Sequence, residues 1–323
     1  MMVAQNAVPE EAITFVGIDV GKHTCVAACQ GRAGVFGFTP DDAGITRFLS
    51  HLRDLPGAVR VGLEASGGDE AALWEALEAA GFHVRQLAPA KICADAKSVG
   101  RRAKTDACDA VTIAAYMAAN PAAGRRIPPA NIREISALTA KRRQVTLMRK
   151  ALACQMKQAR HASIAALNAE MMALIEAQIA TLEKTIDRVI GADEGLAAKR
   201  KLLRSIPGLG EVSAFTLLGA MPELGTMTAG AAASLAGLAP FARDSGTISG
   251  PRFIQGGRSV VRDVLYMAAV RASSLADGLK PFADRLKARH KPGKQVIIAV
   301  ARKLIEAANR VLERGTEWEL RSA

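Results

Sequence analysis

Short apolar runs separated by turn residues open the chain. The segment ITFVGIDV, residues 13–20, is rich in β-branched residues and predicts a strand that ends in an acid. The segments GKHTCVAACQ and GRAGVFGF follow it after polar and Gly-rich breaks. Three short strands joined by tight turns predict an antiparallel meander. AVRVGLEA, residues 58–65, is a fourth predicted strand that ends in an acid, and FHVRQLAP is a fifth.

Helical spacing of apolar residues appears between these strands. Ile45, Phe48, Leu49 and Leu52 recur at intervals of three and four, behind a cap at Thr39 or Asp41. Residues 69–80 predict a second helix. Strands interleaved with helices predict an α/β layer fold around a mixed sheet.

The end of this first domain is marked by a change of pattern. The stretch KICADAKSVGRRAK is expected to be a basic loop that feeds a helix, and Arg101, Arg102 and Lys104 in it are candidate nucleic-acid contacts. Pro128 and Pro129 then break the periodicity. We therefore place the first domain at residues 13–127, after a flexible tail at residues 1–12.

A long helical region follows, which we assign to residues 128–195. Its apolar residues recur at mixed intervals of three and four, which predicts a helical hairpin or coiled coil. No acid occurs between Glu134 and Glu170. Solvated helix faces usually mix both signs, so this run favours contact with nucleic acid. The candidate contacts are Lys141, Arg142, Arg143, Arg149 and Lys150.

Residues 196–323 form a third, mainly helical region. The segment SIPGLGEVSAFTLLG places Gly208 and Gly210 between two apolar helical segments. Such a turn is typical of a helix–hairpin–helix motif, whose backbone N–H groups can hold a DNA phosphate, and equally of a packing joint between helices. A segment dense in Gly, Ser and Arg comes next, and Arg252, Arg258 and Arg262 in it are candidate phosphate contacts.

Composition and charge narrow the function. Lys and Arg total 43 against 31 Asp and Glu, a net charge of +12, and this excess favours a polyanionic partner such as nucleic acid. No stretch approaches the roughly 18 uninterrupted apolar residues of a transmembrane helix, and no signal-peptide pattern opens the chain. The five cysteines include no CxxC pair, so we expect reduced thiols in the cytoplasm.

Four acids stand out by their context. Asp19 and Glu64 each end an apolar strand, where a charge is unfavourable without a partner such as a metal ion. Asp106 and Asp109, in KTDACDA, are three residues apart at a helix start and share one helix face. Converging carboxylates repel one another unless divalent cations bind between them. The set therefore predicts a metal site, and two such metals can act on a phosphodiester.

These motifs resemble a known family. GIDVGKHT, LEASG and GRRAKTDACDA, in this order, resemble the RuvC-like domain of the IS110 family of insertion-sequence transposases, which are DEDD recombinases. SIPGLGEVSAFTLLG, LAGLAPFARDSGTISGPRFIQGGRSVVRDVLYMAA and KLIEAANRVL resemble the second, transposase-specific domain of that family. The resemblance covers roughly residues 13–312.

The resemblance implies a fold, a cofactor and catalytic residues. It implies an RNase H-like first domain in which Asp19, Glu64, Asp106 and Asp109 bind one or two Mg²⁺ ions. It also places Ser245, in DSG, on the family's nucleophilic serine. Chemistry alone leaves Ser249, four residues further on, open as the nucleophile.

The same resemblance implies the partners. These are double-stranded donor and target DNA, and a structured noncoding guide RNA encoded by the element, whose loops pair with both DNAs. The protein is expected to act as a homo-oligomer, from dimer to tetramer, with the acidic site of one protomer completed by the serine of another. A bacterial cytoplasmic location, at the nucleoid when active, is implied as well.

Three other functions are compatible with parts of the sequence. A RuvC-like junction nuclease would use the same four acids through activated water, but it would not need the DSG loop. GIDVG also opens sugar-kinase and actin-like ATPase folds, yet their second phosphate loop is missing from this sequence. A nucleic-acid-binding regulator without catalysis would not need all four acids and the serine. The sequence therefore favours a transposase that exchanges DNA strands.

Overall fold

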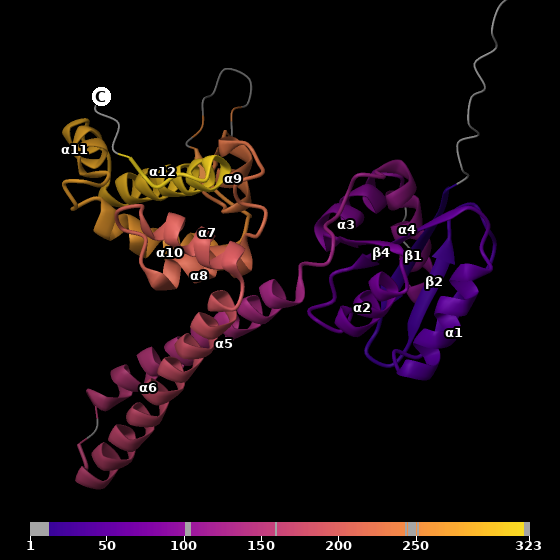
Figure 1. Cartoon of the computed structure of the whole chain (residues 1–323), viewed down its shortest axis with the longest axis horizontal. Coiled ribbons are helices and arrows are strands. Elements are labelled where there is room, and N and C mark those ends of the chain that lie inside the picture. Colours follow the sequence, from indigo (N-terminus) through magenta and orange to yellow (C-terminus); the bar gives the residue numbers. More distant parts are fainter. Residues whose placement is uncertain are drawn as a thin grey trace, which may run out of the picture. The chain divides into compact units, whose positions relative to one another are not determined.

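The computed structural model describes residues 13–100, 105–158, 160–242, 244, 250 and 252–319. Contacts divide the chain into two compact units, with the division between Ile127 and Pro128. The first unit is an α/β layer structure and the second is almost entirely helical (Figure 1).

The first unit is built on one mixed sheet of five strands. Its order is β3-β2-β1-β4-β5, where β1 pairs with β2 and β2 with β3 in antiparallel fashion. β1 pairs with β4 and β4 with β5 in parallel. The sequence-based prediction of a meander followed by two further strands is confirmed. The strands are β1 Ile13–Val20, β2 Cys25–Cys29, β3 Phe36–Phe38, β4 Ala58–Glu64 and β5 His83–Leu87.

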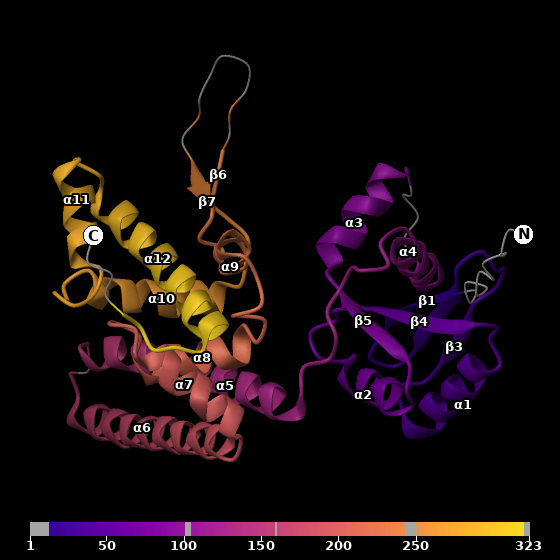
Figure 2. The same ribbon diagram turned by 45° about the horizontal axis from the view of Figure 1, so that its top comes forward.

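Helices cover both faces of this sheet (Figure 2). Helices α1 (Asp42–Arg53) and α2 (Ala71–Ala79) pack on one face, against the side chains that β1 and β4 direct there. Helices α3 (Pro89–Ser98) and α4 (Asp106–Ala119) lie on the other face. The expected cap at the start of α1 is Asp41, whose Oδ1 accepts a hydrogen bond from the Gly44 N–H at 2.7 Å.

The helix α3 corrects the sequence analysis, which predicted a basic loop here. Pro89 stands in the first turn of α3, where its fixed φ favours a helix and its missing N–H is not needed. Ile92 is the one buried side chain of the helix and packs with Leu87 and Met117. A single apolar anchor gives no periodic signal, so the pattern could not reveal this helix. Residues 101–104 lie outside the described part of the chain.

Helix α4 lies with its backbone directly against β1 and packs on β4 through a side chain. A Cβ added at Gly17 of β1 would lie 2.3 Å from both the Ala110 carbonyl oxygen and the Ala114 nitrogen. A Cβ at Gly62 of β4 would lie 2.6 Å from Cγ of Met117. Both positions therefore require glycine for a close approach of helix and sheet. The result is a helix whose backbone touches β1 and whose Met117 side chain fills the space above Gly62 of β4.

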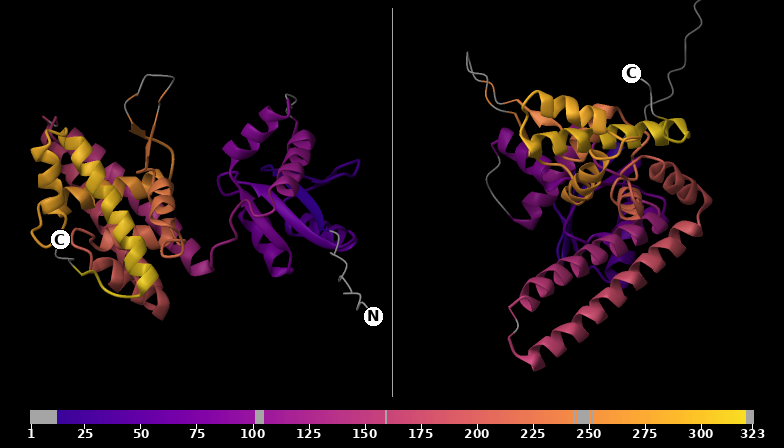
Figure 3. Two further views of the ribbon diagram at one scale, coloured as in Figure 1. Left: turned by 90° about the horizontal axis from the view of Figure 1, so that it is seen from above. Right: turned by 90° about the vertical axis from the view of Figure 1, so that its left-hand side faces the viewer.

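The second unit begins with a helical hairpin and continues as a helical bundle (Figure 3). A short antiparallel pair, β6 (Pro240–Phe241) and β7 (Phe253–Ile254), interrupts the bundle. Within the described ranges, no helix combines the length and the apolar composition needed to cross a lipid bilayer. The helices are α5 Ala130–Met156, α6 Ala162–Gly191, α7 Glu194–Arg204, α8 Glu211–Ala220, α9 Ala229–Leu235, α10 Ser259–Ala272, α11 Lys280–Ala288 and α12 Gly293–Arg314.

The hairpin confirms part of the predicted apolar stripe, whereas another part of that stripe is exposed. Val145 and Leu152 of α5 pack against Ile175 and Ile179 of α6 and close the hairpin. Four further apolar residues of α6 point to solvent and are 47–64% exposed, at positions Ile164, Leu167, Met171 and Leu174. Near its end, α6 instead buries Ile186, Val189 and Ile190 in the core of the second unit. The mixed spacing in the sequence therefore describes two faces of α6, of which one closes the hairpin.

We predict that Gly17→Ala destabilises the protein by about 1–3 kcal/mol, because the new methyl group must push α4 off the sheet. Urea denaturation of the full chain, followed by circular dichroism, measures the change. Gly37→Ala is the matched control, since Gly37 also lies in a strand and no atom lies within 4 Å of a Cβ added there. Equal effects of the two substitutions would contradict the close packing of α4 on β1.

Candidate active site

Two of the four predicted acids lie at the ends of neighbouring parallel strands. The register pairs Gly17 with Gly62 and Ile18 with Leu63, so its next step sets Asp19 beside Glu64. Strand side chains alternate between faces, so both carboxylates lie on the face of the two glycines, which is the face covered by α4. Neighbouring strands are about 4.8 Å apart. Asp19 and Glu64 therefore belong to one edge of the sheet, and both are half-buried.

The other two acids lie in the first turn of α4. Thr105 caps this helix, and its Oγ1 accepts a hydrogen bond from the Cys108 N–H at 3.2 Å. Ala110, which follows Asp109 directly, is one of the residues of α4 that contact Gly17. Asp106 lies one helical turn before Ala110 and therefore on the same side of α4. Asp106 is exposed and Asp109 is half-buried.

The structure brings these acids to the same face of one sheet without closing them into a cluster. Among the described residues, no group of three or more His, Cys, Asp or Glu side chains is placed so that it could hold a metal ion. The donor set nevertheless suits a hard cation, because Mg²⁺ prefers carboxylate oxygens. The four-carboxylate metal site thus stays a prediction, which the geometry of β1, β4 and α4 makes possible.

A fifth carboxylate, which the sequence pattern did not single out, shapes the loop that follows Glu64. Glu70 is 6% exposed. Its Oε2 accepts hydrogen bonds from the Ser66 N–H at 3.2 Å, the Ser66 hydroxyl at 2.7 Å and the Gly68 N–H at 2.9 Å. Burial alone would raise the pKa of Glu70, but the bonds from Ser66 and Gly68 outweigh it and hold the pKa below its ordinary value.

This carboxylate is the first member of a chain of polar contacts that runs from the buried Glu70 to the exposed Arg125. Gln86 of β5 donates from Nε2 to Glu70 Oε1 at 2.5 Å, and Gln86 Oε1 accepts from Arg125 Nε at 2.5 Å. The Arg125 guanidinium lies over the ring of Trp74, 5.9 Å from its centroid. The chain of contacts ties the loop after β4 to β5 and to the segment that ends the first unit. Nothing in the sequence around Glu70 separates it from an ordinary surface acid.

The predicted nucleophile lies in a loop whose ends the structure describes. Ser245 and Ser249 themselves are outside the described residues. At the base of the loop, Phe241 pairs with Phe253 across β6 and β7. Asp244 Oδ1 accepts a hydrogen bond from the Gly250 N–H at 3.1 Å. The two strands thus bring the ends of the serine loop together.

The predicted nucleic-acid contacts on α5 fall into two groups. Lys141 and Lys150 are exposed, and Arg149 is half-buried. Arg142 donates from Nε to Glu183 at 2.7 Å, and its guanidinium lies 5.6 Å from the centre of the Phe215 ring. Arg143 forms an ion pair with Asp263 at 2.5 Å. Arg142 and Arg143 thus hold α5 to the neighbouring helices. Arg101, Arg102 and Lys104 lie outside the described residues.

The candidate contacts of the C-terminal region are similarly divided. Arg258 forms two hydrogen bonds with the Glu223 carboxylate, at 2.7 and 2.8 Å. Arg262 donates to the Gly256 carbonyl at 2.7 Å, and Arg252 is exposed. Gly208 has φ +98°, and a Cβ there would lie 2.7 Å from Cβ of Ala272. The glycine turn therefore packs against α10, whereas Gly210 at the start of α8 is open to its surroundings.

Comparison with known proteins gives the family. Residues 16–163 match a family model described as a transposase, and residues 200–284 match one described as "Transposase IS116/IS110/IS902 family". The chain belongs to the IS110 family of transposases. The resemblance stated from the motifs is thus confirmed, and the enzyme acts on DNA.

The relatives of this transposase include two pilin gene-inverting proteins, from Moraxella bovis and Moraxella lacunata. Each is 29% identical over 325 residues, which cover 95% of this chain and 98% of the relative. The chain is also 33% identical over 123 residues to the "Insertion element IS110 uncharacterized 43.6 kDa protein" of Streptomyces coelicolor. That match covers 37% of this chain and 30% of the relative.

We predict that Glu70→Gln destabilises the transposase at neutral pH by about 1–3 kcal/mol, because buried donors lose a charged acceptor. The native pKa of Glu70 lies below its ordinary value of 4.5, so its contribution is complete above that value and is lost as the pH falls through the native pKa. The difference between wild type and variant should therefore shrink under acid conditions. Urea denaturation at pH 7 and at pH 4 measures it.

The matched control for this experiment is Asp69→Asn, the neighbouring acid, which is exposed. It should change the free energy of unfolding little at either pH. A Glu70→Gln variant as stable as Asp69→Asn at pH 7 would contradict a role of the buried network in holding the loop.

Proposed function

We propose that this transposase cuts and rejoins DNA strands with a metal site formed by Asp19, Glu64, Asp106 and Asp109 and with Ser245 as nucleophile. The observation that carries the proposal is the register of β1 and β4, which sets Asp19 beside Glu64 on the face covered by α4. The sheet order β3-β2-β1-β4-β5, with β4 and β5 parallel to β1, supports an RNase H-like first unit. We also propose that the second unit consists of a helical coiled-coil region at residues 128–195 and a transposase-specific domain at residues 196–323.

The four carboxylates would hold one or two Mg²⁺ ions through oxygen ligands. Such ions neutralise charge that develops on the oxygens of a phosphodiester. Glu70 fixes the backbone of the loop after Glu64. The packing of α4 against Gly17 fixes the helix that carries Asp106 and Asp109. The acids are thereby mounted on elements whose positions other contacts determine, as a preorganised site requires.

Ser245 would attack the scissile phosphorus through its hydroxyl oxygen. A serine–phosphate ester forms, one P–O bond to a deoxyribose breaks, and the departing sugar oxygen takes up a proton equivalent to the one lost by the serine. The ester conserves the bond energy of the phosphodiester, so that a free sugar hydroxyl can reverse the step and join a new strand without ATP. Antiparallel β6 and β7 hold the ends of the loop in support of this role.

The partners follow from the family and from the charge. The net charge of +12 suits donor and target DNA together with a structured guide RNA. The names of the Moraxella relatives describe inversion of a gene, which is also an exchange of DNA strands. A dimer to tetramer of this chain would let the serine of one protomer complete the acidic site of another. We place this activity in the bacterial cytoplasm, at the nucleoid.

The second candidate is a junction nuclease in which water replaces the serine. It shares the geometry of Asp19, Glu64 and α4, and it makes no use of the β6–β7 loop. The two functions differ in whether a covalent protein–DNA ester forms.

We predict that Asp19→Asn or Asp106→Asn lowers strand exchange by more than about a hundredfold while DNA binding persists, because charge at the phosphate is no longer neutralised. Chelation of divalent cations should have the same effect on the wild type. Exchange between donor and target plasmids measures activity, and mobility shift measures binding. Asp42→Asn, an exposed acid of α1, is the control. Full activity of either site variant would refute the metal site.

We predict that Ser245→Ala abolishes strand exchange and keeps complex assembly, since only a hydroxyl group is lost. Trapping on a nicked DNA substrate should give a covalent adduct with wild type and none with Ser245→Ala. Ser249→Ala is the matched control and should retain the adduct. If the pattern of the two variants is reversed, Ser249 is the nucleophile. If both variants keep full activity, the water-based nuclease is correct.

A further inference from the structure

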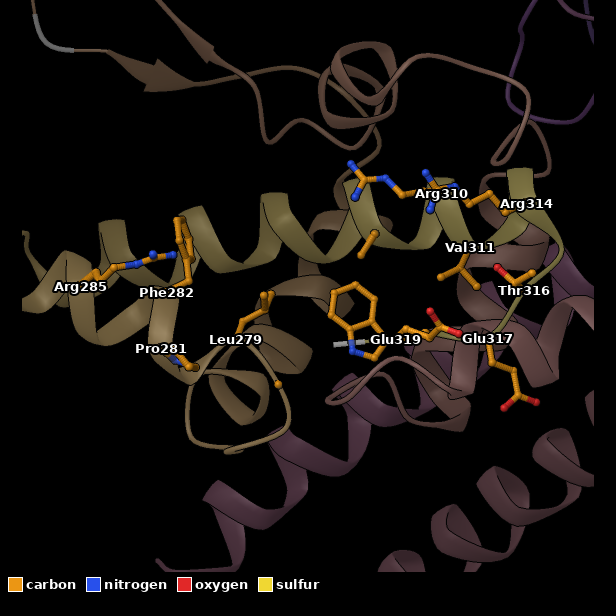
Figure 4. A pocket seen from close by; sticks show the side chains of 13 residues that line it. Leu279, Pro281, Phe282, Arg285, Arg310, Val311, Arg314, Thr316, Glu317 and Glu319 are labelled. Atoms are coloured by element: carbon orange, nitrogen blue, oxygen red, sulfur yellow. The ribbon is translucent and has the colours of Figure 1, made fainter. Parts of the chain in front are cut away.

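The second unit contains a cavity of about 400 Å³ that lies apart in sequence from the acids and the serine loop. It is bounded by α11, by α12 and by residues 316–319, which follow α12 (Figure 4). Its size falls within the range of ligand sites, about 300–1,000 Å³. Leu279, Phe282 and Val311 give it an apolar lining. Its walls are therefore suited to a flat apolar group.

Trp318 lines the same cavity and is firmly placed. Its backbone N–H donates to the Ser205 hydroxyl at 2.8 Å, and its side chain packs against the core of the second unit. The indole Nε1 is buried and has no hydrogen-bond partner in the part of the chain that the structure describes. A buried donor without a partner is unfavourable, and an acceptor on a ligand would satisfy it.

Three arginines line the cavity as well. Arg310 and Arg314 are one turn apart on α12, and Arg285 of α11 extends toward the Phe282 ring (Figure 4). All three are exposed. In contrast to Arg142 and Arg258, none of them forms an ion pair within the described ranges. Their guanidinium groups are thus available to a ligand.

Two glutamates also border the cavity but do not cancel this charge. Glu317 lies 3.0 Å from Nζ of Lys201, which neutralises it locally. Glu319 alone is left to oppose the three arginines. The border therefore carries a net positive charge next to an apolar, aromatic wall.

We propose that this cavity binds one unpaired nucleotide of a nucleic acid. The base would stack in the apolar part against Phe282 and Trp318, and an acceptor on its edge would take the Trp318 Nε1–H. The adjoining phosphate would bind Arg310 and Arg314, whose planar guanidinium groups suit phosphate oxygens. Aromatic side chains that stack bases beside cations that hold the backbone are the usual means of binding single strands.

An acidic peptide would also satisfy the arginines, but it would leave the aromatic wall and Nε1 unused. The nucleotide is therefore favoured. It can come from RNA or from DNA, which share this chemistry. The proposal goes beyond the metal site and the serine, because it concerns neither the acids nor the β6–β7 loop.

The test compares Arg310→Ala/Arg314→Ala with Lys184→Ala/Arg188→Ala in the full chain. The control pair removes the same charge at the same spacing from α6, at exposed positions. Fluorescence anisotropy measures binding of single-stranded RNA and DNA 12-mers of one sequence, of the same strands without bases, and of heparin. We expect a loss of about tenfold or more for the base-containing strands in the first variant, the size expected when one stacked nucleotide is lost, and less than twofold in the control.

The baseless strands and heparin separate stacking from charge. Without a base to hold the phosphate at Arg310 and Arg314, the baseless strands should bind wild type more weakly than the base-containing strands do. For the baseless strands and heparin, the first variant should lose no more affinity than the control pair loses. An equal loss for all probes, or an equal loss in the control pair, would show simple attraction of a polyanion and overturn the proposal. A labelled acidic peptide that binds wild type, loses affinity in the first variant and is not displaced by the 12-mers would overturn the proposal in favour of a peptide. Either preference between RNA and DNA supports the proposal and assigns the source of the nucleotide.

A second variant tests the aromatic side without loss of packing. Trp318→Phe keeps an aromatic ring and removes Nε1–H, so we expect a several-fold weaker affinity for base-containing strands and an unchanged circular dichroism spectrum. Asp19→Asn should bind the 12-mers as wild type does, whatever its activity. Failure of the pocket is thereby distinguishable from failure of the proposed catalysis.

Discussion

The direct contact of α4 with the backbone of β1 is the constraint on which the candidate site depends. Gly17 and Gly62 leave room for the helix, and Asp19 and Glu64 follow each glycine by two residues on the same face. The intervening residues Ile18 and Leu63 are fully buried on the opposite face, under α1 and α2. A shift of one residue in register would exchange the two faces. Burial of the core and placement of the acids are thus determined together.

The loop after β4 is held by a different kind of interaction. Glu70 is a buried charge, which is tolerated because four donors surround it. Through Gln86 and Arg125 the same network reaches β5 and the end of the first unit. The carboxyl edge of the sheet is therefore fixed by hydrogen bonds, whereas its centre is fixed by packing.

The sequence predicted the features that repeat and missed those that depend on one partner. Alternation and turn residues revealed the five strands, and helical spacing revealed α1 and the hairpin. Helix α3 has one buried apolar residue, Ile92, so its sequence shows no helical periodicity of apolar residues from which the helix could be predicted. Glu70 resembled a surface acid because its donors come from the loop and from β5. The four acids were found because each ends a strand or opens a helix, but their convergence depends on distances that a sequence does not contain.

The sequence also could not show which cations form ion pairs within the protein and which are available to nucleic acid. Each ion pair inside the protein removes one charge of each sign, so the pairs of Arg142 and Arg258 leave the net charge unchanged. The field that attracts nucleic acid comes from cations such as Lys141, Lys150, Arg310 and Arg314, which have no acidic partner within the described ranges. Attraction of this kind is independent of sequence and is screened by salt. A pocket that stacks a base acts over contact distance only. Dispersed exposed cations therefore concentrate nucleic acid at the protein surface. The cavity, in contrast, would fix one position along the strand.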